Sequence, residues 1–130
     1  RFTYYGDTRA VSDRASTQDI RTLAESIDAT DLLGQLQPVS YRRKDNPDID
    51  LTAGCDEQAI RYGFIANDVQ KVLPDAVGTV GETDTLCLDY QALNTVLFQV
   101  VKDQEVRLAK LESEKAKMQE FIAAMPRPLA

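Results

Sequence analysis

The residue types available for catalysis are restricted, because the 130 residues of the chain include no histidine and two cysteines. The absence of histidine removes both the Ser-His-Asp arrangement and histidine metal sites. Any catalysis must therefore use a serine, threonine, lysine, aspartate or glutamate side chain. The segment Ser12-Asp13-Arg14 offers one such hydroxyl, although on its own a Ser-Asp pair is typical of an ordinary turn or cap.

The two cysteines, Cys55 and Cys87, are too few and too far apart for a zinc knuckle or a redox pair. Cys87 alternates with Leu86 and Leu88 in a predicted strand, so we interpret it as a buried free thiol. We expect no metal and no cofactor.

The charge of the chain argues against nucleic acid or an anionic membrane as a partner. Its formal net charge is −6, from 21 acidic and 15 basic residues. The one basic run, Arg42-Arg43-Lys44, is followed at once by acidic residues. No apolar run approaches the ~20 residues that a membrane span requires.

Length and hydrophobic spacing predict a single α+β domain, with a small globular body of short helices and β-hairpins followed by a long C-terminal helix. We expect residues 12–89 to form the body, and residues 90–130 to form a helix belonging to the same domain. Residues 1–11 fit the end of a preceding β-rich segment better than a domain core.

Local signals place the elements of the body. A short helix is expected around residues 30–36, with Asp28 or Thr30 as its N-cap, and Pro38 prevents its continuation. Strands are expected at residues 39–42, 60–65, 76–80 and 85–88, the last two forming a hairpin.

Three further residues receive structural roles. Asn67 is expected to cap a short helix that carries Val69, Val72 and Leu73. Gly63 is expected to relieve crowding where another backbone approaches. Asp89 is expected to be the N-cap of the long helix.

The last part of the chain predicts one long helix, since no proline or glycine occurs between Tyr90 and Met125. Apolar residues spaced alternately four and three apart form a heptad seam. This seam consists of Leu97, Val101, Gln104, Leu108, Leu111, Lys115, Met118, Ile122 and Met125. Gln104 and Lys115 interrupt it, and polar residues at such positions cost stability but fix register and oligomeric state.

The helix is expected to pack differently along its length. Val96, Phe98 and Val100 widen the apolar face of the first half, which should pack on the body. The second half carries a narrower stripe, which requires partner helices. The alternative is one amphipathic helix lying on its own domain. Length favours association, because the helix would extend about 50 Å, beyond what so small a body can cover.

Four short segments occur in fixed order: Ser12-Asp13-Arg14, residues 36–41 (LQPVSY), residues 62–74 (YGFIANDVQKVLP) and Leu88-Asp89-Tyr90. From about Ser12 to about Glu114, this order resembles the intramolecular chaperone domain at the C-terminus of bacteriophage tailspikes and tail fibres. That family is typified by the endosialidases and is grouped as the self-cleaving peptidase S74 family.

The resemblance implies an intramolecular chaperone that trimerises and assists the folding of its own precursor's N-terminal fibre or spike segment. Residues 1–11 would then be the end of that fibre, and the seam would form a trimeric coiled coil in a homotrimer. It also implies action in the host cytoplasm during phage assembly, with the fibre part in the virion tail.

The same resemblance implies that Ser12 becomes a new N-terminus after self-cleavage of the Val11–Ser12 bond. The serine hydroxyl would attack the preceding carbonyl, and water would then hydrolyse the resulting ester. The reaction needs a base and donors for the oxyanion. A desolvated lysine can serve as that base.

This chain departs from the family pattern at the base. Family members commonly carry a lysine five residues after the serine, where this chain has Thr17. Threonine cannot act as a base at neutral pH. Lys44 is the next lysine along the chain and could approach through the fold, and Asp13 or Asp19 could serve instead if buried. We expect cleavage to be impaired, or to use a base other than the usual lysine.

Two rival functions follow from these features. Thr17 favours a permanent, non-cleaving trimerisation module of a fibre protein. Related domains also occur in a membrane-bound transcription factor, where cleavage releases a DNA-binding fragment, but the acidic balance and lack of a membrane segment disfavour that function. The mixture of Val, Leu, Ile and Met in the seam does not choose between dimer and trimer.

Overall fold

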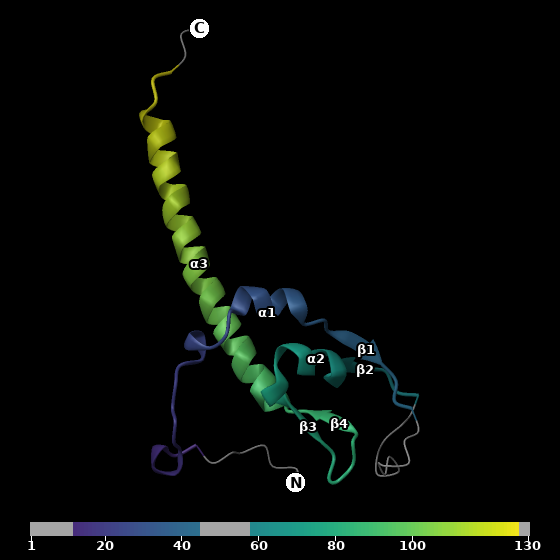
Figure 1. The fold of residues 1–130 in the computed structure, drawn as a ribbon. Helices are drawn as coiled ribbons and strands as arrows, with labels where there is room; N and C mark the ends of the chain where they lie inside the picture. The colour runs from purple at the N-terminus through teal and green to yellow at the C-terminus, as the bar shows by residue number, and fades with distance from the viewer. Residues whose placement is uncertain (1–11, 45–57, 128–130) are drawn as a thin grey trace.

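The computed structural model describes residues 12–44 and 58–127. In chain order its elements are η1 (Arg14–Ser16), η2 (Leu23–Glu25), α1 (Ala29–Gln35), β1 (Val39–Tyr41), β2 (Arg61–Gly63), α2 (Ala66–Val72), η3 (Pro74–Ala76), β3 (Val77–Thr79), β4 (Leu86–Leu88) and α3 (Tyr90–Ala124). The expected α+β organisation, with small β-hairpins and a long C-terminal helix, is confirmed (Figure 1).

The strands form two separate antiparallel pairs. β1 pairs with β2, Val39 lying opposite Gly63, and residues 42–60 connect the two strands. β3 pairs with β4, and the predicted hairpin around residues 76–88 is confirmed. Its loop contains Gly81 at a φ of 58°, in the left-handed region that glycine adopts without strain.

The two short helices begin differently. Asp28 caps α1 as predicted, since its Oδ1 accepts hydrogen bonds from the Thr30 and Asp31 amides at 3.1 and 3.2 Å. The prediction that Asn67 caps α2 is wrong. The helix starts at Ala66, so the cap position is Ile65, which has no side-chain cap bond, and Asn67 lies inside the first turn.

The core forms where α2 and η3 meet the first half of α3. Val69, Ala76 and Leu93 make up the central buried cluster, and Leu36, Phe64, Leu73, Val77, Leu88 and Ala92 pack around it. In the described part of the chain, the other buried apolar side chains are Leu32, Val96 and Val100. So small a core makes the isolated body marginally stable.

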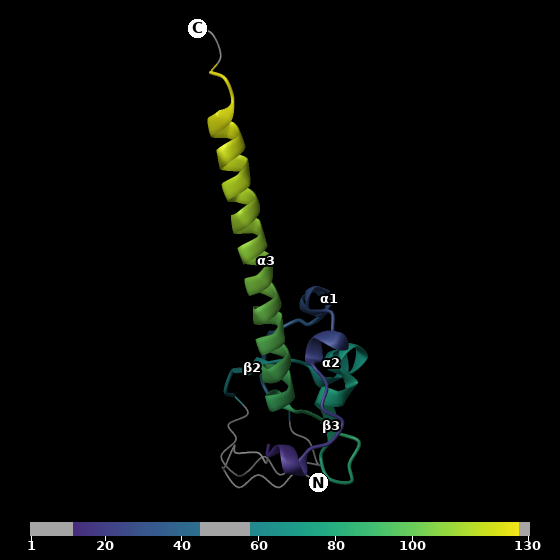
Figure 2. The same cartoon turned by 90° about the vertical axis from the view of Figure 1, so that its left-hand side faces the viewer.

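Helix α3 is anchored to this core at its first residue. Asp89 is its N-cap, as predicted, accepting from the Ala92 amide at 3.1 Å. The Asp89 amide donates to the Ala76 carbonyl at 2.8 Å, which joins the helix start to η3. The first half of α3 packs on the body, and the second half projects beyond it as a straight rod (Figure 2). Within the described ranges, no helix has the combined length and apolarity needed to cross a membrane.

Gly63 lies against the start of α3. A Cβ atom at this position would collide with the Tyr90 hydroxyl and lie 3.5 Å from Cε1 of Tyr41. The predicted crowding is therefore present, but the approaching group is an aromatic side chain and not backbone. This contact places the β1–β2 pair beside the base of the rod.

The glycines give a matched test of this packing. We expect Gly63→Ala to lower the free energy of unfolding by about 1–3 kcal/mol, because the added methyl overpacks the Tyr90 contact. Gly34→Ala is the control, since nothing lies within 4 Å of a Cβ there and Gly34 is inside α1. That change should raise stability by about 0.5–1 kcal/mol. Urea denaturation at one protein concentration measures both, and equal effects would contradict the assigned contact.

Candidate functional site

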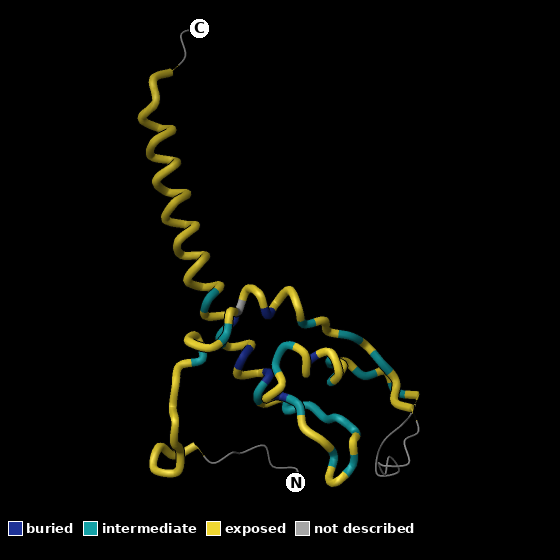
Figure 3. Tube along the Cα trace, in the orientation of Figure 1, coloured by how far each residue is buried: buried dark blue, intermediate teal, exposed yellow. Residues whose placement is uncertain are grey.

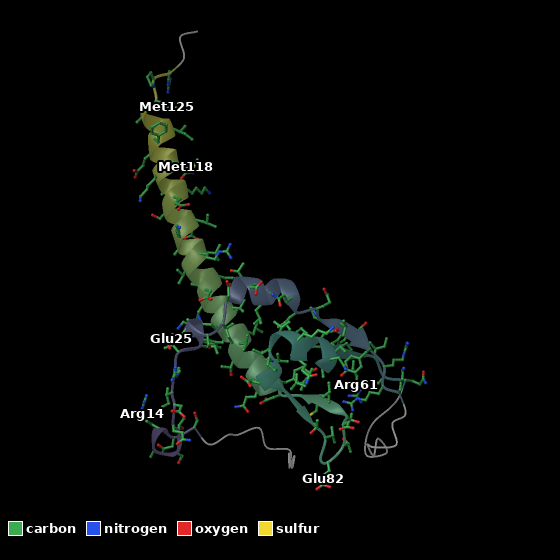
Figure 4. The ribbon with its side chains drawn as sticks, in the orientation of Figure 1. Arg14, Glu25, Arg61, Glu82, Met118 and Met125 are labelled. Carbon is green, nitrogen blue, oxygen red and sulfur yellow. The ribbon has the colours of Figure 1, made fainter. Side chains whose placement is uncertain are left out.

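The segment that carries the predicted cleavage site forms an exposed turn away from the core (Figure 4). Asp13 caps η1, its Oδ1 accepting from the Ala15 amide at 3.0 Å. Its carbonyl accepts from the Ser16 amide at 2.9 Å. The Ser12 side chain is exposed and Val11 lies outside the described residues, so cleavage at Val11–Ser12 stays a prediction.

Thr17 closes this turn. Its hydroxyl donates to the Asp13 carbonyl at 2.7 Å, and its amide donates to the Arg14 carbonyl at 3.2 Å. The residue at the position of the expected lysine therefore has a local structural role, since a side chain-to-backbone bond of this kind stabilises a turn. It brings no amine to Ser12.

The other proposed bases are not gathered around Ser12. Asp13 and Asp19 were expected to serve as a base only if buried, and both are exposed. Lys44 is also exposed and follows β1, which lies across the body from the η1 segment (Figure 1). The single chain does not bring Lys44 beside Ser12, and its role as a base stays a prediction.

A hollow of about 630 Å³ lies between α1, α2, η3 and α3. Its lining mixes apolar side chains, such as Ile27 and Val72, with the carboxylates of Asp31 and Asp75. Ser12 is not among the lining residues, so the hollow is separate from the predicted cleavage chemistry. In the described ranges, no three His, Cys, Asp or Glu residues are grouped as metal ligands.

Helix α3 presents two apolar faces in its first half. Leu93, Val96 and Val100 are buried against the body. Leu97 and Val101 lie roughly a quarter turn further around the helix axis, where both are 55% exposed. One helix therefore holds the core with one face and leaves a second apolar face uncovered.

The predicted seam is uncovered along its length. Its apolar members, Leu97, Val101, Leu108, Leu111, Met118, Ile122 and Met125, are between 51% and 64% exposed. Gln104 and Lys115 are exposed as well. Exposed apolar stripes of this kind are typical of interaction surfaces, because monomeric proteins rarely expose large apolar patches.

The expectation for Phe98 is wrong. It does not join Val96 and Val100 against the body, and 69% of its surface is exposed. The reason is angular: at about 100° per residue, Phe98 points well away from the face shared by Val96 and Val100. Spacing two apart in a helix does not place residues on one face.

The spacing of the seam extends toward the start of α3. Tyr90 and Asn94 continue the alternating spacing of four and three toward the start of α3. Tyr90 is 45% exposed and touches Gly63, so the seam starts at the β1–β2 pair. Spacing alone could have located both residues, but their polar groups obscured the pattern.

Beyond the body, α3 stands alone. In the described part of the chain, its residues after Asp103 are all exposed (Figure 3). Arg107 makes the hydrogen bond to the body furthest along the helix among the described residues, with Nη1 donating to Thr30 Oγ1 at 3.2 Å. Residues 108–124 therefore form a free rod, on which Met118 is labelled in Figure 4.

Comparison with protein families identifies the body. The family model of peptidase S74, described as the chaperone of endosialidase, matches residues 12–78. The match covers just over half of the chain, and the chain belongs to this family. The predicted resemblance to the endosialidase-type chaperone domain is confirmed over residues 12–78, which hold three of the four segments, and it supports a chaperone role.

The boundaries of this match separate the two candidate sites. It begins at Ser12, the residue of the predicted cleavage, and ends within β3. Helix α3 lies outside the matched residues. The family match therefore describes the body and does not extend to the seam.

Proposed function

We propose that this chain is an intramolecular chaperone that assembles as a homotrimer through the seam of α3 and assists the folding of its precursor's preceding segment. That segment would be a phage tail fibre or tailspike. Assembly would take place in the host cytoplasm, and the fibre would become part of the virion tail. Three copies, rather than two, are the number that the family resemblance implies.

One observation carries this proposal: a long seam, apolar except at Gln104 and Lys115, is exposed on a helix that projects from a body with a small core. Burying the exposed half of a Leu, Val, Ile or Met side chain contributes about 1 kcal/mol. The seam has seven such residues per chain. Their burial would stabilise each chain by an amount comparable with the total stability of a small domain.

The proposed assembly explains how such a domain assists folding. An intertwined β-fibre has mostly non-local contacts, so its unassisted nucleation is slow and prone to aggregation. A trimer formed first by α3 would hold three fibre strands together and raise their effective concentration. Cleavage afterwards would remove the assembler and leave a fibre that unfolds slowly.

Removal of the free rod tests the assembly. We expect the chain to behave as a monodisperse trimer in light scattering, and a version lacking residues 108–130 to be a monomer with its body folded. The matched control lacks residues 126–130, which lie beyond the last seam position, and should remain a trimer. Circular dichroism checks the body. A full-length chain that stays monomeric at micromolar concentration would contradict the proposal.

Cleavage at Val11–Ser12 forms the second part of the proposal, and we propose that it is slow in this chain. Thr17 supports this, because it replaces the expected lysine and is hydrogen-bonded into the turn. The alternative, a permanent trimerisation module that never cleaves, is favoured by the same observation.

A substitution at position 17 tests the cleavage. In a longer precursor containing the preceding segment, Thr17→Lys should raise the fraction cleaved at Ser12 by roughly tenfold or more, since a general base contributes at least this much. Thr17→Ala removes the same hydrogen bond without adding an amine and should give no gain. Adding Ser12→Ala to the lysine variant should abolish the product.

Intact mass spectrometry of the precursor measures these fractions. Near-complete cleavage at Ser12 in the unchanged chain would show that another base acts efficiently, and would contradict the proposed impairment. Absence of cleavage in every variant, including Thr17→Lys, would support the permanent trimerisation module instead.

A further inference from the structure

Two charged residues flank the free part of the seam on opposite sides. Arg107 immediately precedes Leu108, and Glu112 immediately follows Leu111. They are five residues apart, a spacing that places them too far around the helix to touch within one chain. In heptad terms, with Leu108 at position a and Leu111 at position d, Arg107 is at g and Glu112 is at e.

Arg107 is already oriented by the body. Its Nη1 donates to Thr30 Oγ1 at 3.2 Å, and Thr30 lies in the first turn of α1. A guanidinium has five N–H donors in a fixed fork, so this bond leaves the other donors for a second acceptor. Glu112 is exposed, and within the described residues its side chain makes no hydrogen bond or ion pair.

We propose that the seams meet in parallel and in register, with Arg107 of each chain paired to Glu112 of the neighbouring chain. This inference rests on the proposed assembly of α3. In a parallel coiled coil a g residue lies beside the e residue of the next heptad on its neighbour, and opposite charges there set partner and orientation. Residues 107 and 112 have this relation, and their charges are complementary.

The opposite orientation gains less from the same flanks. Antiparallel helices bring e positions together and g positions together. This would place Glu105 near Glu112 of the neighbour, two like charges, and Arg107 near Glu114, an opposite pair, so the two contacts would offset each other. The parallel arrangement places the Lys115 side chains of all copies at the same height along the coiled coil, where their like charges would repel. The lysine stem is long enough to carry its ammonium out of the seam toward Glu114 of the neighbour.

The pairing makes Arg107 a positioning residue that couples the body to the assembly. One part of its guanidinium holds α1 of its own chain, and the rest holds the neighbouring helix. Docking of α1 on α3 therefore pre-orients the group that fixes register. An unfolded body would leave the seam without this constraint.

Charge reversal in the full chain tests the pairing. Arg107→Glu and Glu112→Arg should each lower the trimer association constant by on the order of 30-fold, about a factor of three at each of three equivalent contacts. The double reversal should return the constant to within about threefold of the unchanged chain, because each pair is restored with its signs exchanged. Sedimentation equilibrium over a range of concentrations measures these constants.

A matched control reverses Lys117 and Glu120 together, since both are exposed and neither borders the seam. This control keeps the net charge and should leave the association constant unchanged. Thr30→Val removes the acceptor that orients Arg107 and leaves the sequence of α3 unchanged. It should lower the trimer association constant, because Arg107 would be less well placed to pair with Glu112.

Each outcome separates this inference from the proposed assembly. The Arg107–Glu112 pairing would be overturned if the single reversals left the trimer association constant unchanged, or if the double reversal lowered it as much as the single reversals do. The proposed trimer itself would not be contradicted by either result. Tighter association on Glu112→Arg alone would show that the helices run antiparallel. An unchanged chain that is monomeric would overturn both the pairing and the assembly on which it rests.

Discussion

The rest of the structure depends on one constraint: a single helix carries two apolar faces, and the body covers one of them. Helix α3 holds the core with Leu93, Val96 and Val100, and carries the uncovered seam on the neighbouring face. Among the described residues, the short elements of the body cover the first face and leave the second exposed. In the proposed assembly, the hydrophobic effect would favour both folding of the body and association of α3, and would link the two processes.

This linkage suits a domain of the chaperone family to which the chain belongs. In the proposed assembly, a body with only marginal stability of its own would be stabilised further when the helices associate, so assembly and body folding would reinforce each other. The segment ahead of Ser12 joins the body through the exposed η1 turn, away from the core. Residues 12–17 contribute no side chain to the described core, which fits the proposed order of assembly followed by cleavage.

In residues 12–17, one residue that differs from the family pattern has a structural role in place of the expected chemical one. A lysine would offer an amine, whereas Thr17 uses its hydroxyl to close a turn on Asp13. The turn is stable because Asp13 also caps η1. The polar composition of residues 12–17 does not say which side chains hold the turn; the hydrogen-bond geometry assigns that role to Asp13 and Thr17.

The sequence by itself determined the elements whose causes are local: Asp28 and Asp89 as caps, the hairpin around Gly81, and the long helix with its seam. It misplaced the cap of α2, because whether the helix starts two residues earlier depends on packing as well as on Asn67. Only the tertiary structure decided that Phe98 faces solvent, that Tyr90 meets Gly63, and that Arg107 reaches Thr30. These facts depend on which side of α3 the body covers, and that choice is made by contacts between residues far apart in the chain.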